Sequence, residues 1–254
     1  LNMLKKNKNA LIGYTGFIGS NLKKIKNNIE YFNSKNINKI KNKKYKNIIC
    51  AGTYSKIWLA KKNPKKDKKN INYLIKSLKT VEAEKFFLIS TCEIYGKQKN
   101  TFENSKIKVL PSYAYGYNRH KLEKFVESNF EKNYLIRLPI VYGKNFSKNF
   151  LFDLINNKNI ENLNGNDLVQ IYNVSNLKKH INYVEKKNIR KLNISSKPIK
   201  LKKIAKKIFK IHLNNKNKFR EINIKSLYGK NNGCYFLSEK KTWQDLKIFL
   251  KYKI

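Results

Sequence analysis

Three glycines at intervals of three residues, close to the start of the chain, constrain its fold more than any other feature. Gly13, Gly16 and Gly19 lie between a short apolar run, residues 10–12, and a segment with helical spacing of apolar residues, residues 17–25. In such a unit the first glycine permits a tight turn, the second lets a pyrophosphate approach the backbone, and the third lets the helix pack on the strand. The N–H groups at the helix start favour an anion. The sequence therefore predicts a dinucleotide-binding turn; the alternative is a glycine-rich turn without a ligand.

Short apolar runs alternate with longer segments of helical periodicity over the first half of the chain. The predicted strands cover residues 10–12, 29–32, 47–51, 86–90 and 134–138, and the predicted helices cover residues 17–25, 68–81 and 115–131. Such alternation is typical of βαβ units, in which helices cover both faces of a parallel sheet. The predicted fold class is therefore α/β, a Rossmann-like doubly wound parallel sheet.

The pattern becomes less regular after Tyr142. Helical segments are predicted at residues 150–156, 176–184 and 201–211, with short strand-like runs at residues 169–174 and 192–194. This mixture indicates a small C-terminal mixed α/β lobe. We expect a dinucleotide-binding Rossmann domain over residues 1–145 and a smaller substrate-binding lobe over residues 146–254, partly interleaved with the main sheet.

The formal net charge of +41 by itself favours a polyanionic partner. However, the only arginines among the 57 basic residues are Arg119, Arg137, Arg190 and Arg220, whereas base-specific contacts rely on the bidentate arginine side chain. The lysines are spread along the whole chain, together with many Asn, Ile, Tyr and Phe residues, whose codons are rich in A and T. We therefore interpret the charge as the composition of a low-GC genome, and expect no specific nucleic-acid partner.

The remaining composition argues against a membrane or a metal. No apolar run approaches the roughly 20 residues that a membrane span needs, so we expect a cytoplasmic protein without a membrane partner. Cys50, Cys92 and Cys234 are odd in number and far apart, and the three histidines lack a paired spacing. We expect buried, apolar cysteines and no metal site.

Several motifs, in order along the chain, resemble the extended short-chain dehydrogenase/reductases, specifically the NAD-dependent epimerase/dehydratase family that acts on nucleotide sugars. The matching segments are residues 10–22, with the glycines followed by Phe-Ile-Gly-Ser-Asn-Leu, and residues 48–52, 88–96 and 137–143. The resemblance covers nearly the whole chain. It implies an NAD- or NADP-dependent oxidoreductase or isomerase in polysaccharide biosynthesis, with a nucleotide-sugar substrate. It also implies a possible homodimer through helices 68–81 and 115–131.

The resemblance also assigns residues to the cofactor and the substrate. The implied cofactor-binding residues are Gly13, Thr15, Gly16, Phe17, Ile18, Gly19, Asn33, Ser34, Ala51, Gly52, Asn70 and Pro139, and Asn149 falls near a substrate-contacting asparagine. The second strand normally ends in an acidic residue that binds the adenosine ribose. Here Asn33 takes that place, so no carboxylate repels a 2′-phosphate, and Ser34 and Lys35 can bind one. This substitution slightly favours NADP over NAD.

The resemblance implies a catalytic tyrosine followed four residues later by a lysine, with a Ser or Thr that orients the reacting oxygen. Thr91 occupies the hydroxyl position, and Ser90 is the less favoured alternative. The chain offers two overlapping pairs: Tyr117 with Lys121 matches the motif literally, and Tyr115 with Arg119 matches the surrounding register. At about 100° per residue, Tyr115 and Arg119 lie near the apolar side of the helix, whereas Tyr117 and Lys121 lie opposite.

Periodicity therefore favours Tyr115 and Arg119 as the catalytic pair, with Tyr117 and Lys121 as the alternative. A guanidinium can lower the pKa of a tyrosine by its charge but does not readily release a proton. The presence of Arg119 leaves two functional hypotheses. One is an active sugar-nucleotide epimerase, dehydratase or reductase. The other is a catalytically impaired NAD(P)-binding sensor or scaffold.

Overall fold

The computed structural model of the protein describes residues 8–251, apart from Lys24 and residues 231–232. The chain divides into two compact units. The first comprises Leu1–Gly96, Lys106–Arg137 and Asn176–Leu192, and the second comprises Lys97–Ser105, Leu138–Ser175 and Asn193–Ile254. In this division the second unit begins at Leu138 instead of the predicted residue 146, takes in residues 97–105, and is interrupted where residues 176–192 return to the first unit.

A six-stranded sheet forms the centre of the first unit. Its strands are β1 (Asn9–Ile12), β2 (Ile29–Phe32), β3 (Lys44–Cys50), β4 (Glu82–Thr91), β5 (Asn133–Leu138) and β9 (Lys191–Asn193). They lie in the order β2-β1-β3-β4-β5-β9, and β1 pairs in parallel with both β2 and β3. The predicted Rossmann-like parallel sheet is therefore confirmed. The chain runs from β1 outward to β2 and then crosses to β3 on the other side of β1, which makes this point the topological switch of the sheet.

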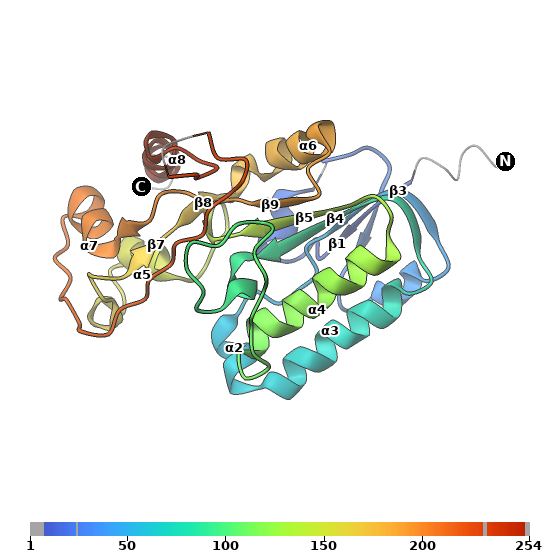
Figure 1. The fold of residues 1–254 in the computed structure, drawn as a ribbon, viewed down its shortest axis with the longest axis horizontal. Coiled ribbons are helices and arrows are strands. Elements are labelled where there is room, and N and C mark those ends of the chain that lie inside the picture. Colours follow the sequence, from blue (N-terminus) through green and yellow to red (C-terminus); the bar gives the residue numbers. More distant parts are fainter. Residues whose placement is uncertain (1–7, 24, 231–232, 252–254) are drawn as a thin grey trace. The chain divides into compact units, whose positions relative to one another are not determined.

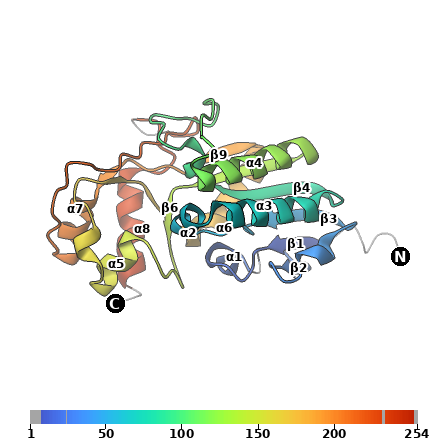
Figure 2. The same ribbon diagram turned by 90° about the horizontal axis from the view of Figure 1, so that it is seen from below.

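Helices cover both faces of the sheet, as the alternating pattern predicted. The helices of this unit are α1 (Phe17–Asn21), α2 (Ile57–Lys62), α3 (Pro64–Leu78), α4 (Ala114–Asn129) and α6 (Leu177–Lys187). Figures 1 and 2 show α3 and α4 side by side along one face, and α6 on the other.

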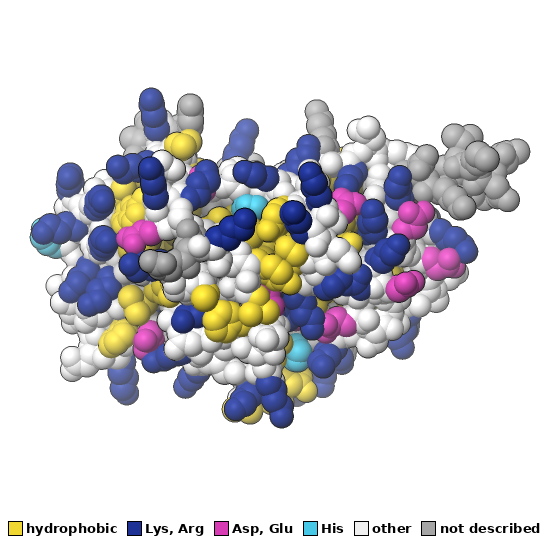
Figure 3. All heavy atoms as spheres, turned by 45° about the horizontal axis from the view of Figure 1, so that its top comes forward, with side chains coloured by type: hydrophobic (Ala, Val, Ile, Leu, Met, Phe, Trp, Pro, Cys, Tyr) yellow, Lys and Arg dark blue, Asp and Glu magenta, His cyan; other side chains and the backbone are white. Residues whose placement is uncertain are grey.

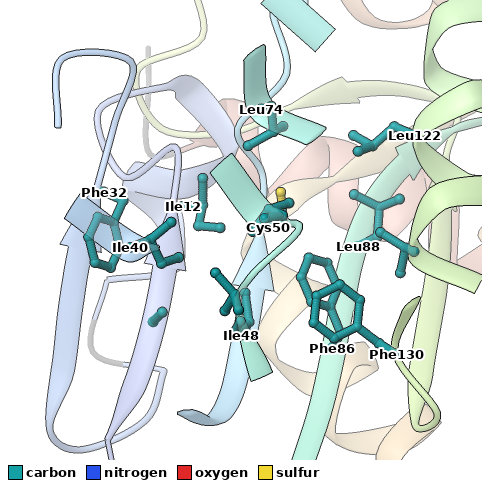
Figure 4. Packing of buried hydrophobic residues seen from close by; sticks show 14 of the residues in the cluster. Ile12, Phe32, Ile40, Ile48, Cys50, Leu74, Phe86, Leu88, Leu122 and Phe130 are labelled. Carbon is teal, nitrogen blue, oxygen red and sulfur yellow. The ribbon is translucent and has the colours of Figure 1, made fainter. Parts of the chain in front are cut away.

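The core of the first unit lies between the sheet and these two long helices. Ile12 and Phe86 of the strands, Leu74 of α3 and Leu122 of α4 all belong to one cluster of buried side chains (Figure 4). Burying an aliphatic or aromatic side chain of this size contributes about 1.5–3 kcal/mol. The periodicity that places Leu122 in this cluster also fixes which side of α4 faces the sheet.

Three predicted elements differ from the structure for local reasons. The first helix ends at Asn21 instead of residue 25, because Leu22 closes its last turn with an N–H bond to the Gly19 carbonyl. The helix predicted over residues 68–81 is α3, which begins at Pro64, since the Asn63 side chain caps it and proline is accepted in the first turn. The strand predicted for the smaller lobe at residues 192–194 is β9, which joins the main sheet beside β5.

The second unit contains two small sheets and three α-helices among its described residues. The strands β6 (Ile140–Tyr142) and β8 (Ile171–Asn173) pair in parallel, and β7 (Leu168–Val169) pairs antiparallel with β10 (Ile199–Lys200). The helices are α5 (Phe150–Asn156), α7 (Leu201–Ile204), which continues as a π-helical turn over Ala205–Phe209, and α8 (Glu239–Lys251). This is the predicted mixed α/β character.

Buried polar side chains connect distant segments within the second unit. The fully buried Gln170 accepts the Ile224 N–H at 2.9 Å and donates to the Ile224 carbonyl at 2.8 Å. Glu103 accepts hydrogen bonds from the Asn193 N–H at 2.8 Å and the Ser226 hydroxyl at 2.6 Å. A short unit with little regular structure is thus fixed by satisfied polar groups as well as by apolar packing.

Basic side chains are spread over the face shown in Figure 3, some of them in small groups. No helix among the described residues is long and apolar enough to cross a membrane. Cys50 and Cys92 are buried as expected, but Cys234 is exposed, so the expectation of three buried cysteines is wrong at that position.

Candidate active site

The glycine-rich turn lies where the carboxyl ends of β1 and β3 meet. Ile12 pairs with Cys50, and the Ala51 N–H donates to the Ile12 carbonyl at 2.9 Å. A methyl group added to Gly13 would lie 2.3 Å from the Ala51 carbonyl oxygen, and Gly13 has a φ of +85°. Only glycine fits this close approach of two backbones.

The other two glycines of the turn differ in what surrounds them. A methyl group on Gly19 would lie 2.1 Å from the Gly13 carbonyl oxygen, so Gly19 lets α1 pack against the turn. On Gly16 the methyl group would meet the same oxygen at 3.3 Å and no other atom within 4 Å outside its chain neighbours. The backbone at Gly16 is thus open on the side where a pyrophosphate would lie, at the switch point of the sheet. The turn fits a dinucleotide.

The end of β2 carries the polar residues predicted to meet the adenosine ribose. The Asn33 side chain accepts the Lys35 N–H at 2.9 Å and donates to the Tyr14 hydroxyl at 3.4 Å. Ser34 and Lys35 are exposed. The Tyr14 ring, from the glycine-rich turn, lies 5.5 Å from the Lys23 ammonium. Polar and cationic side chains therefore surround residue 33, where the acidic residue at the end of the second strand is replaced by Asn33.

The remaining predicted cofactor residues are distributed over both units. Thr15 is exposed in the turn, Phe17 and Ile18 are half-buried at the start of α1, Gly52 is exposed after β3, and Asn70 is half-buried on α3. Pro139 and Asn149 belong to the second unit. Asn149 has a φ of +101°, caps α5 by accepting the Leu151 N–H at 2.9 Å, and donates to the Val141 carbonyl at 2.9 Å. Its contact with a substrate stays a prediction.

Thr91 lies at the last position of β4, where the strand enters a 3₁₀ turn, Cys92–Tyr95. Its hydroxyl accepts the Glu93 N–H at 3.1 Å, so it retains a proton that it can donate. The start of α4 packs closely on this turn, because a methyl group on Gly116 would lie 2.3 Å from the Glu93 carbonyl oxygen. The Tyr113 hydroxyl donates to the Glu93 carboxylate. Thr91 and Tyr115 thus belong to segments that pack on each other.

Tyr115 and Arg119 face inward from α4, as the periodicity predicted. Both are buried, with 7% and 2% of their surfaces exposed. The guanidinium carbon of Arg119 lies 3.9 Å from the centre of the Tyr115 ring, so the two side chains stack. Arg119 Nη1 donates to the Asp67 carboxylate at 2.5 Å and Nη2 donates to the Tyr54 carbonyl at 2.6 Å. The remaining nitrogen, Nε, is buried without a hydrogen-bond partner.

Asp67 is the partner that sequence reasoning missed. It lies in the first turn of α3, where the helix dipole favours a carboxylate, and it is buried. Its Oδ2 also accepts from Asn118 Nδ2 at 2.7 Å. An acidic residue just before the predicted helix start at residue 68 was the available signal, but the 52 positions that separate it from Arg119 gave no reason to pair the two.

The charges around Tyr115 oppose one another. Burial raises the pKa of its phenol above the ordinary value; the Arg119 guanidinium acts in the opposite direction, and the Glu93 and Asp67 carboxylates again raise it. The net result is a raised pKa, so Tyr115 keeps its proton at neutral pH.

The alternative pair, Tyr117 and Lys121, lies on the outer side of α4. Tyr117 is 39% exposed, and the Lys121 ammonium donates to the Asn72 side chain of α3 at 2.9 Å. The structure brings these two residues together with the neighbouring helix and not with the Thr91 turn.

A second buried charge pair in the first unit also escaped the sequence analysis. Glu123 of α4 receives two hydrogen bonds from Arg137 of β5, from Nε at 3.1 Å and from Nη2 at 2.9 Å. Ser90 donates to the same carboxylate at 2.5 Å, and Arg137 Nη1 donates to the Tyr95 hydroxyl at 2.7 Å. Ser90 is therefore engaged with Glu123, and Thr91 is the hydroxyl that remains for chemistry.

The strand order of the sheet, the glycine-rich turn at its switch point and the inward-facing Tyr115 together define a dinucleotide-binding protein of the Rossmann class. The family model for the NAD dependent epimerase/dehydratase family matches residues 28–179. The chain belongs to this family, which confirms the predicted resemblance and the predicted class of NAD(P)-dependent enzyme. No curated protein matches the chain.

Solved structures of nucleotide-sugar enzymes share the fold. dTDP-4-dehydrorhamnose reductase from Bacillus anthracis str. Ames, in complex with NADP, has 19% identity and a TM-score of 0.70, over 97% of this chain and 99% of the other. UDP-N-acetylglucosamine 4-epimerase from Methanobrevibacter ruminantium M1, in complex with UDP-N-acetylmuramic acid, has 14% identity and a TM-score of 0.71, over 98% of each chain. MoeE5 in complex with UDP-glucose and NAD has 14% identity and a TM-score of 0.68, over 87% and 90%. These identities establish a common fold.

Proposed function

We propose that this protein uses NAD or NADP to oxidise or reduce a nucleotide-linked sugar, as an epimerase, dehydratase or reductase of polysaccharide or cell-surface glycan biosynthesis in the cytoplasm. The observation that carries the proposal is the open backbone at Gly16, beside the Gly13–Ala51 contact at the switch point, in a unit that also holds Tyr115 and Thr91. The fold it shares with enzymes bound to NADP, or to NAD with UDP-glucose, supports the proposal.

Each site residue has a definite task in this proposal. The bound nicotinamide supplies or accepts the hydride. Tyr115 exchanges a proton with the sugar oxygen, and Thr91 donates a hydrogen bond that orients this oxygen. The glycine-rich turn holds the pyrophosphate through backbone groups.

A binding titration tests the cofactor site without knowledge of the sugar. We expect NADH or NADPH to bind saturably, with a rise in nicotinamide fluorescence and in the melting temperature. Gly16→Glu puts a carboxylate where the pyrophosphate lies and abolishes binding. Gly16→Ala has room to fold, but it binds more weakly than the wild type because its methyl group lies on the same open side. Failure of the wild-type protein to bind any of NAD, NADP, NADH and NADPH would refute the proposed function.

The end of β2 supports a preference for NADP. Ser34 and Lys35 are exposed next to Asn33, where they are able to meet a 2′-phosphate. We expect Lys35→Ala to weaken NADPH binding about tenfold and NADH binding hardly at all, while the exposed Lys39→Ala serves as the matched control. Equal weakening of both cofactors would argue for a general charge effect.

A pair of tyrosine variants separates the two candidate acids. With a panel of nucleoside-diphosphate 4-keto sugars, Tyr115→Phe is expected to lower kcat by about 10²–10⁴. Tyr117→Phe removes an exposed hydroxyl on the outer side of α4 and leaves kcat unchanged. Loss of activity in Tyr117→Phe alone would transfer the catalytic assignment to Tyr117 and Lys121.

A second candidate function rests on Arg119. Its guanidinium is engaged by Asp67, Tyr54 and the Tyr115 ring, so it has fewer donors for a cofactor ribose than a lysine ammonium. An NAD(P) sensor or scaffold would bind the cofactor as above, and would turn over none of the keto sugars or their reduced forms.

The family resemblance also supports a homodimer through α3 and α4. Tyr73 of α3 and Tyr117 of α4 are 46% and 39% exposed, and aromatic side chains are enriched in protein interfaces. Light scattering after gel filtration tests this proposal. A dimer that Tyr73→Lys dissociates supports it, and a monomer at micromolar concentration contradicts it.

A further inference from the structure

The strongest unassigned feature of the first unit is the buried carboxylate of Asp67. It lies 2.5 Å from Arg119 Nη1, and only 6% of its side-chain surface is exposed. In the proposed mechanism, the cation four residues after the tyrosine lowers the pKa of the phenol by its positive charge. A carboxylate bound directly to that cation cancels much of its field, because an ion pair acts on a third group as a dipole and not as a charge.

Among the charged groups Arg119 has the largest effect on the phenol and lowers its pKa, and the Glu93 and Asp67 carboxylates oppose it. The guanidinium stacks on the ring of Tyr115, 3.9 Å from the ring centre, and is held there by the Tyr54 carbonyl. A second carboxylate, Glu93, faces Tyr115 from the 3₁₀ turn after β4 and is itself engaged by Tyr113. The charged groups around the phenol are therefore one cation, from α4, and two carboxylates, from α3 and from the turn after β4.

We propose that Asp67 is a positioning residue which neutralises Arg119, so that Tyr115 acts as a proton donor and the enzyme catalyses reduction of a keto group on its substrate. The proposal rests on the proposed function above and selects one of its three reaction types. Oxidation of a sugar hydroxyl, which begins epimerisation and dehydration, requires tyrosinate as the base, and this site disfavours tyrosinate. Reduction requires the protonated phenol.

The reductive step balances with the groups named. A hydride from the reduced nicotinamide forms a C–H bond at the carbonyl carbon, the C=O π bond breaks, and the oxygen takes the Tyr115 phenolic proton. The keto group is reduced to a secondary alcohol and the cofactor is oxidised. The tyrosinate that remains regains its proton from water. Arg119 stabilises it transiently, which is the role that a permanently charged guanidinium can fill without giving up a proton.

Ionisation of Tyr115 can be measured without any substrate. Tyrosinate absorbance is titrated with pH in the wild-type protein and in Tyr115→Phe, and the difference isolates this one phenol among the 16 tyrosines. Free tyrosine ionises near pH 10. In the wild-type protein we expect Tyr115 to ionise only above that pH. In Asp67→Asn we expect it to ionise at a pH lower by about one or more, because Arg119 is then unneutralised.

Two further variants keep the test decisive. Asp67→Glu keeps the carboxylate and is expected to titrate like the wild type. If Asp67→Asn does not fold, the titration of wild-type Tyr115 still decides, because ionisation at or below pH 10 overturns the proposal. Glu127→Gln removes a carboxylate of α4, the helix that carries Tyr115; this carboxylate pairs with Lys191, and its removal leaves the titration unchanged. Ionisation of wild-type Tyr115 at or below pH 10, or an identical titration in folded Asp67→Asn, would overturn the proposal.

Steady-state rates supply the second readout. With NADPH and a keto sugar, the rate of reduction by the wild-type enzyme is expected to stay constant up to about pH 9. In Asp67→Asn the rate is expected to begin to decline at a pH about one unit lower. A failure of the proposed function shows as absent cofactor binding, while the titration of Tyr115 still reports on Asp67. The two failures are therefore distinguishable.

Discussion

Two buried arginine–carboxylate pairs each have one member on α4, and their hydrogen bonding differs. Arg137 and Glu123 meet through two parallel hydrogen bonds, with Tyr95 on the arginine and Ser90 on the carboxylate. Arg119 and Asp67 meet through a single nitrogen, and Arg119 Nε is buried without a hydrogen-bond partner. The first pair connects α4 with β5 and the second connects it with α3.

This difference separates a structural role from a functional one. A buried ion pair repays its desolvation only when its geometry is good and its remaining polar atoms are bonded, as for Glu123. The Arg119 pair leaves a donor unsatisfied and instead stacks on the tyrosine that we propose as the acid. Incomplete satisfaction beside a candidate catalytic group is what is expected where function has shaped the residues.

The largest effect is expected from removal of the Glu123 carboxylate. Glu123→Ala leaves Arg137 charged and buried without its main partner, which costs about 3–5 kcal/mol of unfolding free energy. Urea denaturation measures the loss, with Glu127→Ala on the surface of the same helix as control. A loss below about 1 kcal/mol would show that the pair is not the structural one.

A smaller effect is expected for the other pair. Asp67→Ala is expected to lower the unfolding free energy by about 1–3 kcal/mol, because Arg119 keeps the Tyr54 carbonyl and the Tyr115 ring as partners. The same denaturation experiment decides. If Asp67→Ala and Glu123→Ala cost the same, the contrast between the two pairs fails.

The acid side of the stability profile sharpens the comparison. Burial alone would raise the pKa of Glu123, but the Arg137 guanidinium and the hydrogen bonds from Arg137 and Ser90, with the His120 ring nitrogen 3.9 Å away, hold it below the ordinary value of 4.5. Its stabilisation is fully present above that value and is lost as the pH falls through the lower pKa of the folded state. Below about pH 4.5 we expect Glu123→Gln to show a flatter decline than the wild type, by up to about 1.4 kcal/mol per pH unit. Parallel curves would contradict this.

The smallest effect is expected on the outer side of α4. Lys121 is exposed and bonded to Asn72 only through a surface contact, so Lys121→Ala changes the unfolding free energy by less than about 0.5 kcal/mol. The variant should also bind NADPH like the wild type. A loss of binding would revive the alternative pair of Tyr117 and Lys121.

Local spacing in the sequence determined much of this protein. The three glycines fixed the turn at the switch point, and strand–helix alternation fixed the parallel sheet. A step of about 100° per residue placed Tyr115 and Arg119 inward and Tyr117 outward. These features depend on neighbours within a few residues, which is why they could be predicted from one chain.

Tertiary structure alone decided the partners of the buried charges and the course of the later chain. Asp67 and Arg119 come from different helices, and Glu123 and Arg137 from a helix and a strand; such contacts arise when elements pack and leave no periodic trace. The same holds for α6 and β9, whose return to the first unit moved residues 176–192 out of the predicted second lobe. Long-range pairing depends on burial and desolvation in the assembled unit, whereas turns and helix faces depend on local conformation.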